Sequence, residues 1–181
     1  MASVGFELFC QMLDEAVHEL RGEVVVHEVD PELSFDCDAL LPEDYVGDIG
    51  VRLSLYKRLA SASGPEEVDD LAVEMEDRFG VPPAEARRLV HLMRLKTELR
   101  RLRVLACEAS ARSVTLHLRT DTPLDPAKIL KLVQPKASNY KLTPDMRLTR
   151  RTRETEAYTS GLEATDKLLS ELSGCLKAEA S

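Results

Sequence analysis

Four carboxylates in the segment Pro65–Phe79 recur at a spacing that a helix would turn into one stripe. They follow one another at intervals of three, four and three residues: Glu67, Asp70, Glu74 and Asp77. The stripe would lie away from the apolar side formed by Val68, Leu71 and Met75. Neighbouring like charges on a helix repel by roughly a few tenths of a kcal/mol per pair, so helix stability does not explain the row. A basic partner would explain it, and a merely solvated helix face is the other interpretation.

The next segment, Ala84–Arg103, carries the opposite charge. Its basic residues are Arg87, Arg88, Arg94, Lys96, Arg100, Arg101 and Arg103, with only Glu85 and Glu98 against them. Such a row is able to contact the phosphates of DNA. No aromatic residues interleave with it to stack bases, and the chain as a whole is acidic. Pairing with the acidic first half of the chain is therefore the preferred interpretation, and DNA contact through this helix is the alternative.

Catalytic patterns are absent from the sequence. It contains no phosphate-binding loop, no dinucleotide fingerprint and no nucleophile elbow. Its four histidines are scattered, and its four cysteines lie far apart with no pair at metal-binding spacing, so buried free thiols are expected. Carboxylate pairs for acid–base chemistry cannot be told from solvated acidic surfaces without a pocket. We therefore expect no catalytic residue, no metal site and no cofactor site in this chain.

The charge of the chain is divided between its two halves. The net charge of −8 over 181 residues combines −15 in residues 1–80 with +7 in residues 81–181. Such asymmetry is typical of interaction proteins, although the two halves can also pair within one fold. No apolar run approaches the length of a membrane span, and no signal peptide is recognisable, so a cytoplasmic protein without membrane contact is expected.

The acidic and the basic residues form continuous rows only if their segments are helical. The spacing of apolar residues, together with the positions of proline and glycine, predicts where the helices lie. Helices are predicted at Phe6–Leu20, Val51–Ala62, Pro65–Phe79, Ala84–Arg103, Pro126–Val133 and Glu154–Leu176. Strands are predicted at Val104–Glu108, Arg112–Arg119, Tyr140–Leu142 and Met146–Arg150, with short extended segments at Val24–Val26 and Leu33–Cys37. Residues 23–50 form an acidic, extended arm that we expect to be the least globular part. The fold class is α+β, with helices in the first half and a short, mainly antiparallel sheet with flanking helices in the second.

Several segments closely resemble the C-terminal (TRCF) domain of the bacterial transcription-repair coupling factors, the Mfd family. They are VGFELFCQMLDEAV (Val4–Val17), RLSLYKRLASA (Arg52–Ala62), VEMEDRFGVPP (Val73–Pro83) and, more loosely, LTPDMRLTR (Leu142–Arg150). The resemblance covers most of the chain in order. It implies that residues 1–22 form a helix leading out of an upstream translocase motor. Residues 23–181 would then be a single α+β domain, the C-terminal TRCF domain.

The family resemblance also implies a function. Members are ATP-dependent DNA translocases, using ATP and Mg in the motor, that bind stalled RNA polymerase and DNA and recruit excision repair through UvrA. Their C-terminal domain is non-catalytic. It docks on the N-terminal UvrB-like module of the same protein, masks the UvrA-binding surface and represses the motor. Two acids of the family's docking helix match Glu74 and Asp77.

The chain departs from the family pattern at three points. Glu76 stands where the family often has leucine or isoleucine, which makes this helix more acidic than usual. Gly47 replaces a proline of the family. The family commonly ends the fourth helix with Leu-Gly-Ile, whereas this chain has Leu102-Arg103-Val104. This last change leaves the end of the fourth helix open.

Overall fold

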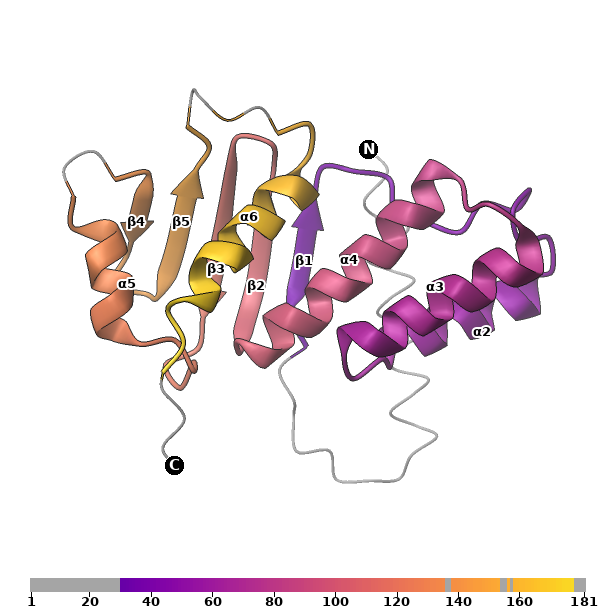
Figure 1. Cartoon of the computed structure of the whole chain (residues 1–181), viewed down its shortest axis with the longest axis horizontal. Coiled ribbons are helices and arrows are strands. Elements are labelled where there is room, and N and C mark those ends of the chain that lie inside the picture. The colour runs from indigo at the N-terminus through magenta and orange to yellow at the C-terminus, as the bar shows by residue number, and fades with distance from the viewer. Residues whose placement is uncertain (1–29, 136–137, 154–155, 157, 178–181) are drawn as a thin grey trace. The chain divides into compact units, whose positions relative to one another are not determined.

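The computed structural model of the chain describes residues 30–135, 138–153, 156 and 158–177 (Figure 1). The predicted helix Phe6–Leu20, the strand Val24–Val26 and the proposed division at residue 22 lie outside these residues. The described chain forms two compact units, the first made of residues 38–97 and the second of residues 30–37 together with the residues from 98 onward.

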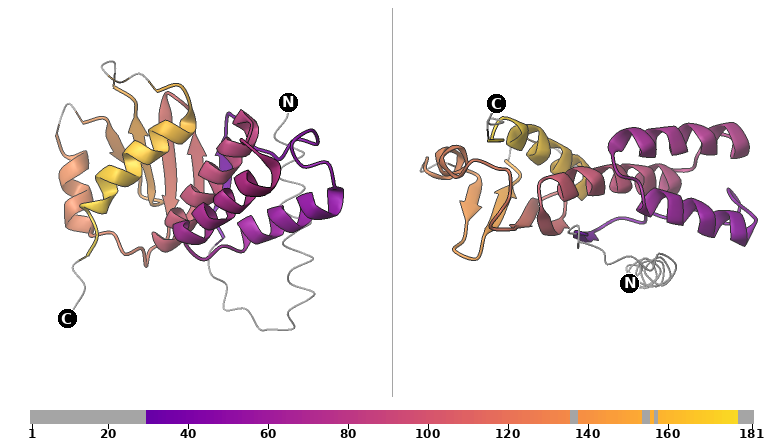
Figure 2. Two further views of the ribbon diagram at one scale, coloured as in Figure 1. Left: turned by 45° about the vertical axis from the view of Figure 1, so that its right-hand side comes forward. Right: turned by 90° about the horizontal axis from the view of Figure 1, so that it is seen from below.

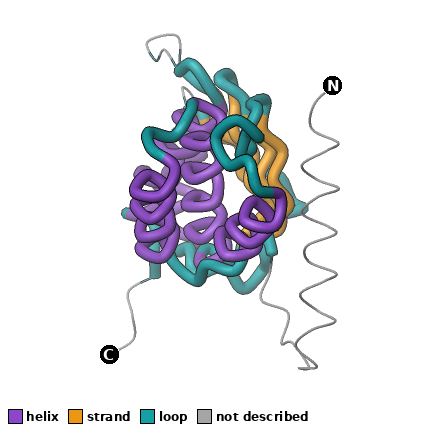
Figure 3. Tube along the Cα trace, turned by 90° about the vertical axis from the view of Figure 1, so that its right-hand side faces the viewer, coloured by secondary structure: helices purple, strands orange, loops and turns teal. Residues whose placement is uncertain are grey.

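The first unit is helical. It contains α2 (Ile49–Ala60), α3 (Pro65–Phe79) and the first part of α4 (Ala84–Arg101). Helix α2 begins two residues earlier than predicted, because the Asp48 carboxylate accepts a hydrogen bond from the backbone N–H of Val51 at 2.9 Å and caps it. Helices α2 and α3 lie side by side and contact each other (Figures 2 and 3). Both helices bury apolar residues, which are Leu55 and Leu59 of α2 and Val68, Leu71 and Met75 of α3.

Helix α3 has the ends that its sequence predicts. Pro65 occupies the first turn, where the missing N–H costs nothing, and Gly80 ends the helix with a φ of 83°. The loop before α2 differs from the expectation of a poorly globular arm. In residues 38–48, Ala39, Leu41 and Val46 are buried. The loop is held by a hydrogen bond from the Leu41 N–H to the Tyr56 hydroxyl at 2.7 Å.

The second unit contains a five-stranded sheet in the order β1-β2-β3-β5-β4. The strands are β1 (Glu32–Phe35), β2 (Val104–Ala109), β3 (Ser113–Leu118), β4 (Tyr140–Leu142) and β5 (Arg147–Arg151). Only the pair β1–β2 is parallel, so the predicted α+β class with a mainly antiparallel sheet is confirmed. Strand β1 lies at an edge, where the preceding Pro31 interrupts no ladder.

One face of the sheet is covered by helix α6 (Gly161–Ser173), which contacts β2 and β3, while α5 (Pro126–Val133) contacts β4. Figure 1 shows α6 crossing this face. Apolar residues that point toward α6, among them Cys107, Leu116 and Leu148, are fully buried. Gly161 is required at the start of α6, because a Cβ there would lie 2.6 Å from the backbone oxygen of Ala109.

Three predicted helix ends in the second unit are wrong, and one of them is the end of α6, which lies at Ser173 and not at Leu176. Helix α6 begins at Gly161, later than predicted, because the Ser160 hydroxyl accepts a hydrogen bond from the Glu163 N–H and caps it. Helix α4 ends at Arg101, and Arg103 adopts the left-handed conformation with a φ of 56°. Glycine takes this conformation without steric cost, whereas a residue with a side chain does not. Strand β2 begins at Val104, as predicted.

Candidate interaction surfaces

The four acids predicted on α3 lie on its outer side but differ in their surroundings. Glu67, Asp70 and Asp77 are exposed, and Glu74 is partly buried. Asp70 and Asp77 make no side-chain hydrogen bond or ion pair with the described residues. Their carboxylates therefore remain available to a basic partner.

Glu74 is held inside the unit by two arginines. Its carboxylate accepts hydrogen bonds from Arg58 of α2 at 2.8 and 2.5 Å and from Arg78, one turn along α3, at 2.8 Å. The hydrogen bonds from Arg58 and then Arg78 lower the pKa of Glu74 to about 2. The predicted stripe thus contains an ion-paired acid beside unpaired ones, and Glu74 joins α2 to α3.

Glu67 also has a local structural role. Its carboxylate accepts hydrogen bonds from the Ser63 N–H at 2.9 Å and from the Ser63 hydroxyl at 2.5 Å. These bonds lower the pKa of Glu67. Because the N-cap residue Gly64 has no side chain, Glu67 fixes the chain that enters α3. Within the predicted stripe, Asp70 and Asp77 are the acids that have no side-chain partner among the described residues.

The outer side of α3 has further members that the charge pattern alone did not identify. Val73 is 61% exposed and lies three residues after Asp70 and four before Asp77. Glu66 and Glu76 are exposed on the same helix. The position of Val73 could have been predicted from the sequence. A residue three positions after Asp70 and four positions before Asp77 lies on the same side of a helix as both acids.

The basic row on α4 is largely engaged with neighbouring groups. Within the first unit, Arg88 donates to the backbone oxygen of Asp38 at 2.6 Å and Arg94 pairs with Asp69 at 3.2 Å. Within the second unit, Arg100 pairs with Asp30 at 2.8 Å. These partners belong to the acidic first half of the sequence, as the preferred interpretation expected. Arg101 remains exposed, with no side-chain partner among the described residues.

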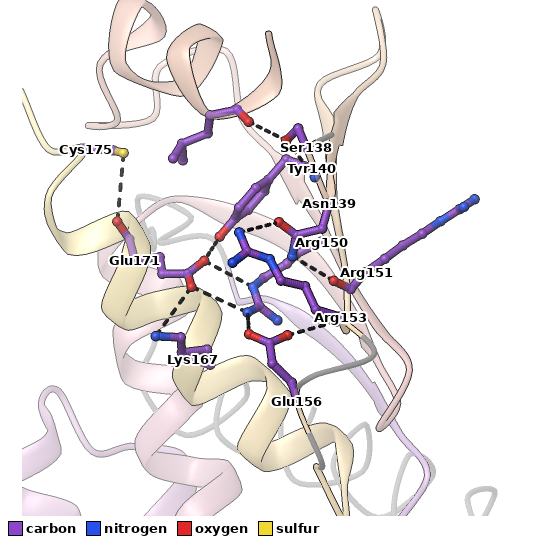
Figure 4. A network of polar contacts seen from close by, with 11 residues as sticks. Ser138, Asn139, Tyr140, Arg150, Arg151, Arg153, Glu156, Lys167, Glu171 and Cys175 are labelled. Atoms are coloured by element: carbon purple, nitrogen blue, oxygen red, sulfur yellow. Dashed lines mark hydrogen bonds and ion pairs between the residues drawn. The ribbon is translucent and has the colours of Figure 1, made fainter. Parts of the chain in front are cut away.

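The second unit contains a buried ionic cluster that the sequence did not reveal (Figure 4). Arg150 on β5 is only 1% exposed and points toward α6, where it donates to Glu171 at 3.1 Å and to Glu156 at 2.6 Å. The Tyr140 hydroxyl bonds the same Glu171 carboxylate, and the Tyr158 ring lies 5.8 Å from the guanidinium carbon. The cluster joins the β4–β5 hairpin to α6.

Burial and hydrogen bonding act in opposite directions on this cluster. Burial alone would raise the pKa of Glu171, but hydrogen bonds from Tyr140 and Arg150 outweigh it, so the pKa lies below its usual value. For Tyr140, burial and the Glu171 carboxylate together raise the pKa. The carboxylate and the phenol therefore keep their neutral-pH charge states over a wide pH range.

Two cysteines of the second unit are buried. Burial raises the pKa of the Cys107 thiol to about 12 and also raises that of Cys175, as expected for buried free thiols. Among the described residues, no group of three or more metal-ligating side chains lies together. None of the described helices is long and apolar enough to span a membrane.

Fold and surfaces together define an α+β domain whose distinguishing exposed features are charged surfaces. The chain belongs to the TRCF domain family, whose model matches residues 35–129. It is 37% identical over 180 residues to the transcription-repair-coupling factor of Myxococcus xanthus, covering 99% of this chain and 15% of that protein. It is 30% identical over 155 residues to the transcription-repair-coupling factor of Escherichia coli, and this match covers 82% of this chain and 13% of that protein.

A solved structure supports the fold independently. The C-terminal domain of a transcription-repair coupling factor matches with a TM-score of 0.64 and 24% sequence identity, over 81% of this chain and 91% of that one. The family predicted from the sequence and the α+β fold are therefore confirmed. The chain spans only 15% and 13% of the two relatives described above.

Proposed function

We propose that this chain is a non-catalytic, autoinhibitory docking domain of a transcription-repair coupling factor. The acidic outer side of α3 docks on arginines of the N-terminal UvrB-like module of the same protein. Docking masks the UvrA-binding surface and represses the ATP-dependent DNA translocase. RNA polymerase, DNA and UvrA are partners of the whole protein in this proposal.

The observation that carries the proposal is the pair of unengaged acids on α3. Asp70 and Asp77 are exposed, lack an intramolecular partner among the described residues and lie on either side of the exposed Val73. An apolar side chain within a charged rim is the usual anatomy of a docking surface. Asp77 also matches an acid of the family's docking helix, and its position near the end of α3 is unfavourable for an anion unless a cation pairs with it.

The proposal is tested by titrating the separately purified N-terminal module with this chain at two salt concentrations. Asp77→Arg is expected to weaken binding by about tenfold or more, because it replaces an attraction by a repulsion in the interface. The matched control is Asp36→Arg, an equal charge change at an exposed acid of the second unit. In the whole protein, Asp77→Arg is expected to raise basal ATPase activity and UvrA binding. Equal binding by the wild type and both variants would refute the assignment of α3.

The ion pairs of Glu74 make it a less direct probe. Glu74→Arg removes a possible contact with the partner but also places three arginines together at the α2–α3 contact. A loss of binding in that variant therefore has two causes. A loss of binding in Asp77→Arg has a single cause, the lost contact with the partner, because no described residue pairs with Asp77.

A further inference from the structure

We infer that the sheet face opposite α6 binds the phosphate backbone of duplex DNA through β3, β5 and β4. This surface is separate from α3, and the inference goes beyond the proposed function. It also differs from DNA contact through α4, whose arginines are largely engaged within each unit.

The strand register identifies which residues share this face. Side chains alternate along a strand, so the neighbours of the buried Leu148 and Arg150 point away from α6. One row crosses all five strands through Ser34, Glu108, Thr115, Thr149 and Lys141. A second row contains Glu32, Ala106, His117 and Arg147, and Arg151 pairs with Ser113 in a third. Figure 4 shows Arg151 extending away from α6 while Arg150 points toward it.

Charge is distributed unevenly over this face. The two acids of the rows, Glu32 and Glu108, lie on β1 and β2. Lys141 and Arg151 are exposed on β4 and β5 and have no side-chain ion pair among the described residues. Arg147 reaches Asp145 at 2.9 Å and Glu108 at 3.8 Å, and all three side chains are at least 45% exposed. Such exposed pairs are weak and salt-sensitive, so they leave Arg147 able to contact an external anion.

The composition of the face indicates a phosphate backbone as its occupant. The exposed large hydrophobic residues of the described chain include none on β3, β4 or β5. Protein interfaces and membrane-binding surfaces both need such apolar anchors. The outward positions of these strands also contain no Phe, Tyr or Trp, which excludes base stacking as the main contact with a single strand.

The available groups fit sequence-independent contact with duplex phosphates. Arginine, lysine and threonine hydroxyl groups are common donors to phosphate oxygens. Arg147 and Arg151 are four residues apart on one strand, a distance of about 13 Å at roughly 3.3 Å per residue. One strand of B-DNA presents a phosphate about every 3.4 Å of helix axis, so a row of this length faces several.

The inference is tested with the whole 181-residue chain and a fluorescently labelled duplex, by anisotropy over a salt series. Wild-type chain is expected to bind at low salt and to lose affinity steeply as salt rises. Lys141→Glu with Arg151→Glu is expected to lower affinity by about tenfold or more. Neutralising both by Lys141→Gln and Arg151→Gln is expected to reduce the slope of log K against log salt by about 2.

A matched control changes the same residue types elsewhere. Lys131→Glu with Arg101→Glu alters net charge equally at two exposed sites on α5 and α4. We expect this control to retain most of the wild-type affinity. Equal losses in both double variants would overturn the inference. A loss in the control alone would also overturn it, because DNA contact would then lie at α4 or α5. Absence of binding at low salt, or stronger competition by polyglutamate than by unlabelled duplex, would also overturn it.

Discussion

Glu74 in the first unit and Arg150 in the second are each held between two side chains of opposite charge, but their burial differs. The Glu74 side chain is 33% exposed between Arg58 and Arg78, which are 45% and 47% exposed. Arg150 is 1% exposed between Glu156 and Glu171. Solvent screens the first cluster, so its partners can be exchanged. The second is shielded from water and fixes the β4–β5 hairpin to α6.

The comparison distinguishes a surface at α3, where ion-pair partners can be exchanged, from the ion pairs of Arg150, which have a structural role. A basic partner that approaches α3 encounters acids that are already hydrated or loosely paired, and it can replace one ion pair by another at little cost. No such exchange is possible at Arg150, because its removal leaves Glu156 and Glu171, which are 17% and 26% exposed, without their shared buried cation. We therefore expect the proposed autoinhibition to act through α3 and the stability of the sheet to depend on Arg150.

The largest expected effect comes from breaking the buried cluster. Arg150→Met should destabilise the protein by about 3 kcal/mol, because removing one partner of a buried ion pair leaves an uncompensated charge. Urea unfolding monitored by circular dichroism measures the change. The adjacent Arg151→Met is the matched control, since Arg151 is exposed and should change stability by less than about 0.5 kcal/mol. Similar losses in both variants would show that burial does not distinguish the two arginines.

Much of the fold could be predicted from the sequence, because local signals mark the elements. Gly64-Pro65 and Gly80 set the ends of α3, and Asp125-Pro126 sets the start of α5 as predicted. The start of α6 was missed because the capping role of Ser160 was not recognised within a polar segment. The acidic stripe was visible because its members recur at helical spacing.

The pairing of the charged residues could not be predicted in the same way. Arg58 and Glu74 are far apart in sequence and meet only when α2 packs on α3. The strand Met146–Arg150 is predicted without saying which face Arg150 is on, and the pairing of β5 with β3 places Arg150 opposite the buried Val114 on the face that α6 covers. Whether an arginine is buried depends on the register and on the helix above it, which no local pattern encodes.

A smaller effect is expected at the two helix ends that leave ordinary helical geometry. Gly80 ends α3 in the first unit with a φ of 83°, whereas Arg103 follows α4 in the second with a φ of 56°. Arg103→Gly should stabilise the protein by about 0.5–1 kcal/mol, because the left-handed conformation costs a non-glycine residue roughly 1 kcal/mol. Part of the gain is offset by loss of the ion pair with Asp121 at 2.7 Å. Thermal unfolding measures the shift.

A separate variant sets an upper limit on that offset. Asp121→Asn removes the charge partner without changing the backbone at Arg103, but it also removes the ion pair of Asp121 with Arg119 at 2.8 Å, so it should lower stability slightly or leave it unchanged. If Arg103→Gly lowers stability by more than Asp121→Asn does, the backbone at Arg103 carries no relievable strain. The two helix ends would then differ in sequence only, and the departure from the family's glycine would have no energetic consequence.

The smallest expected effect concerns Glu74 and appears as a dependence on pH. Its pKa is about 2 in the folded protein, against an ordinary value of 4.5. A carboxyl with a lowered pKa adds stability above its unfolded pKa, and this contribution is lost as pH falls from about 4.5 toward 2. The stability difference between wild type and Glu74→Gln should therefore be constant at neutral pH and shrink through that range, as measured by urea unfolding at several pH values. Asp70→Asn is the control, because Asp70 has no ion-pair partner among the described residues and lies on the same helix. A pH-independent difference for Glu74→Gln would mean that the two arginines do not hold Glu74 in solution, and Glu74 would then join Asp70 and Asp77 as a free acid of the docking surface.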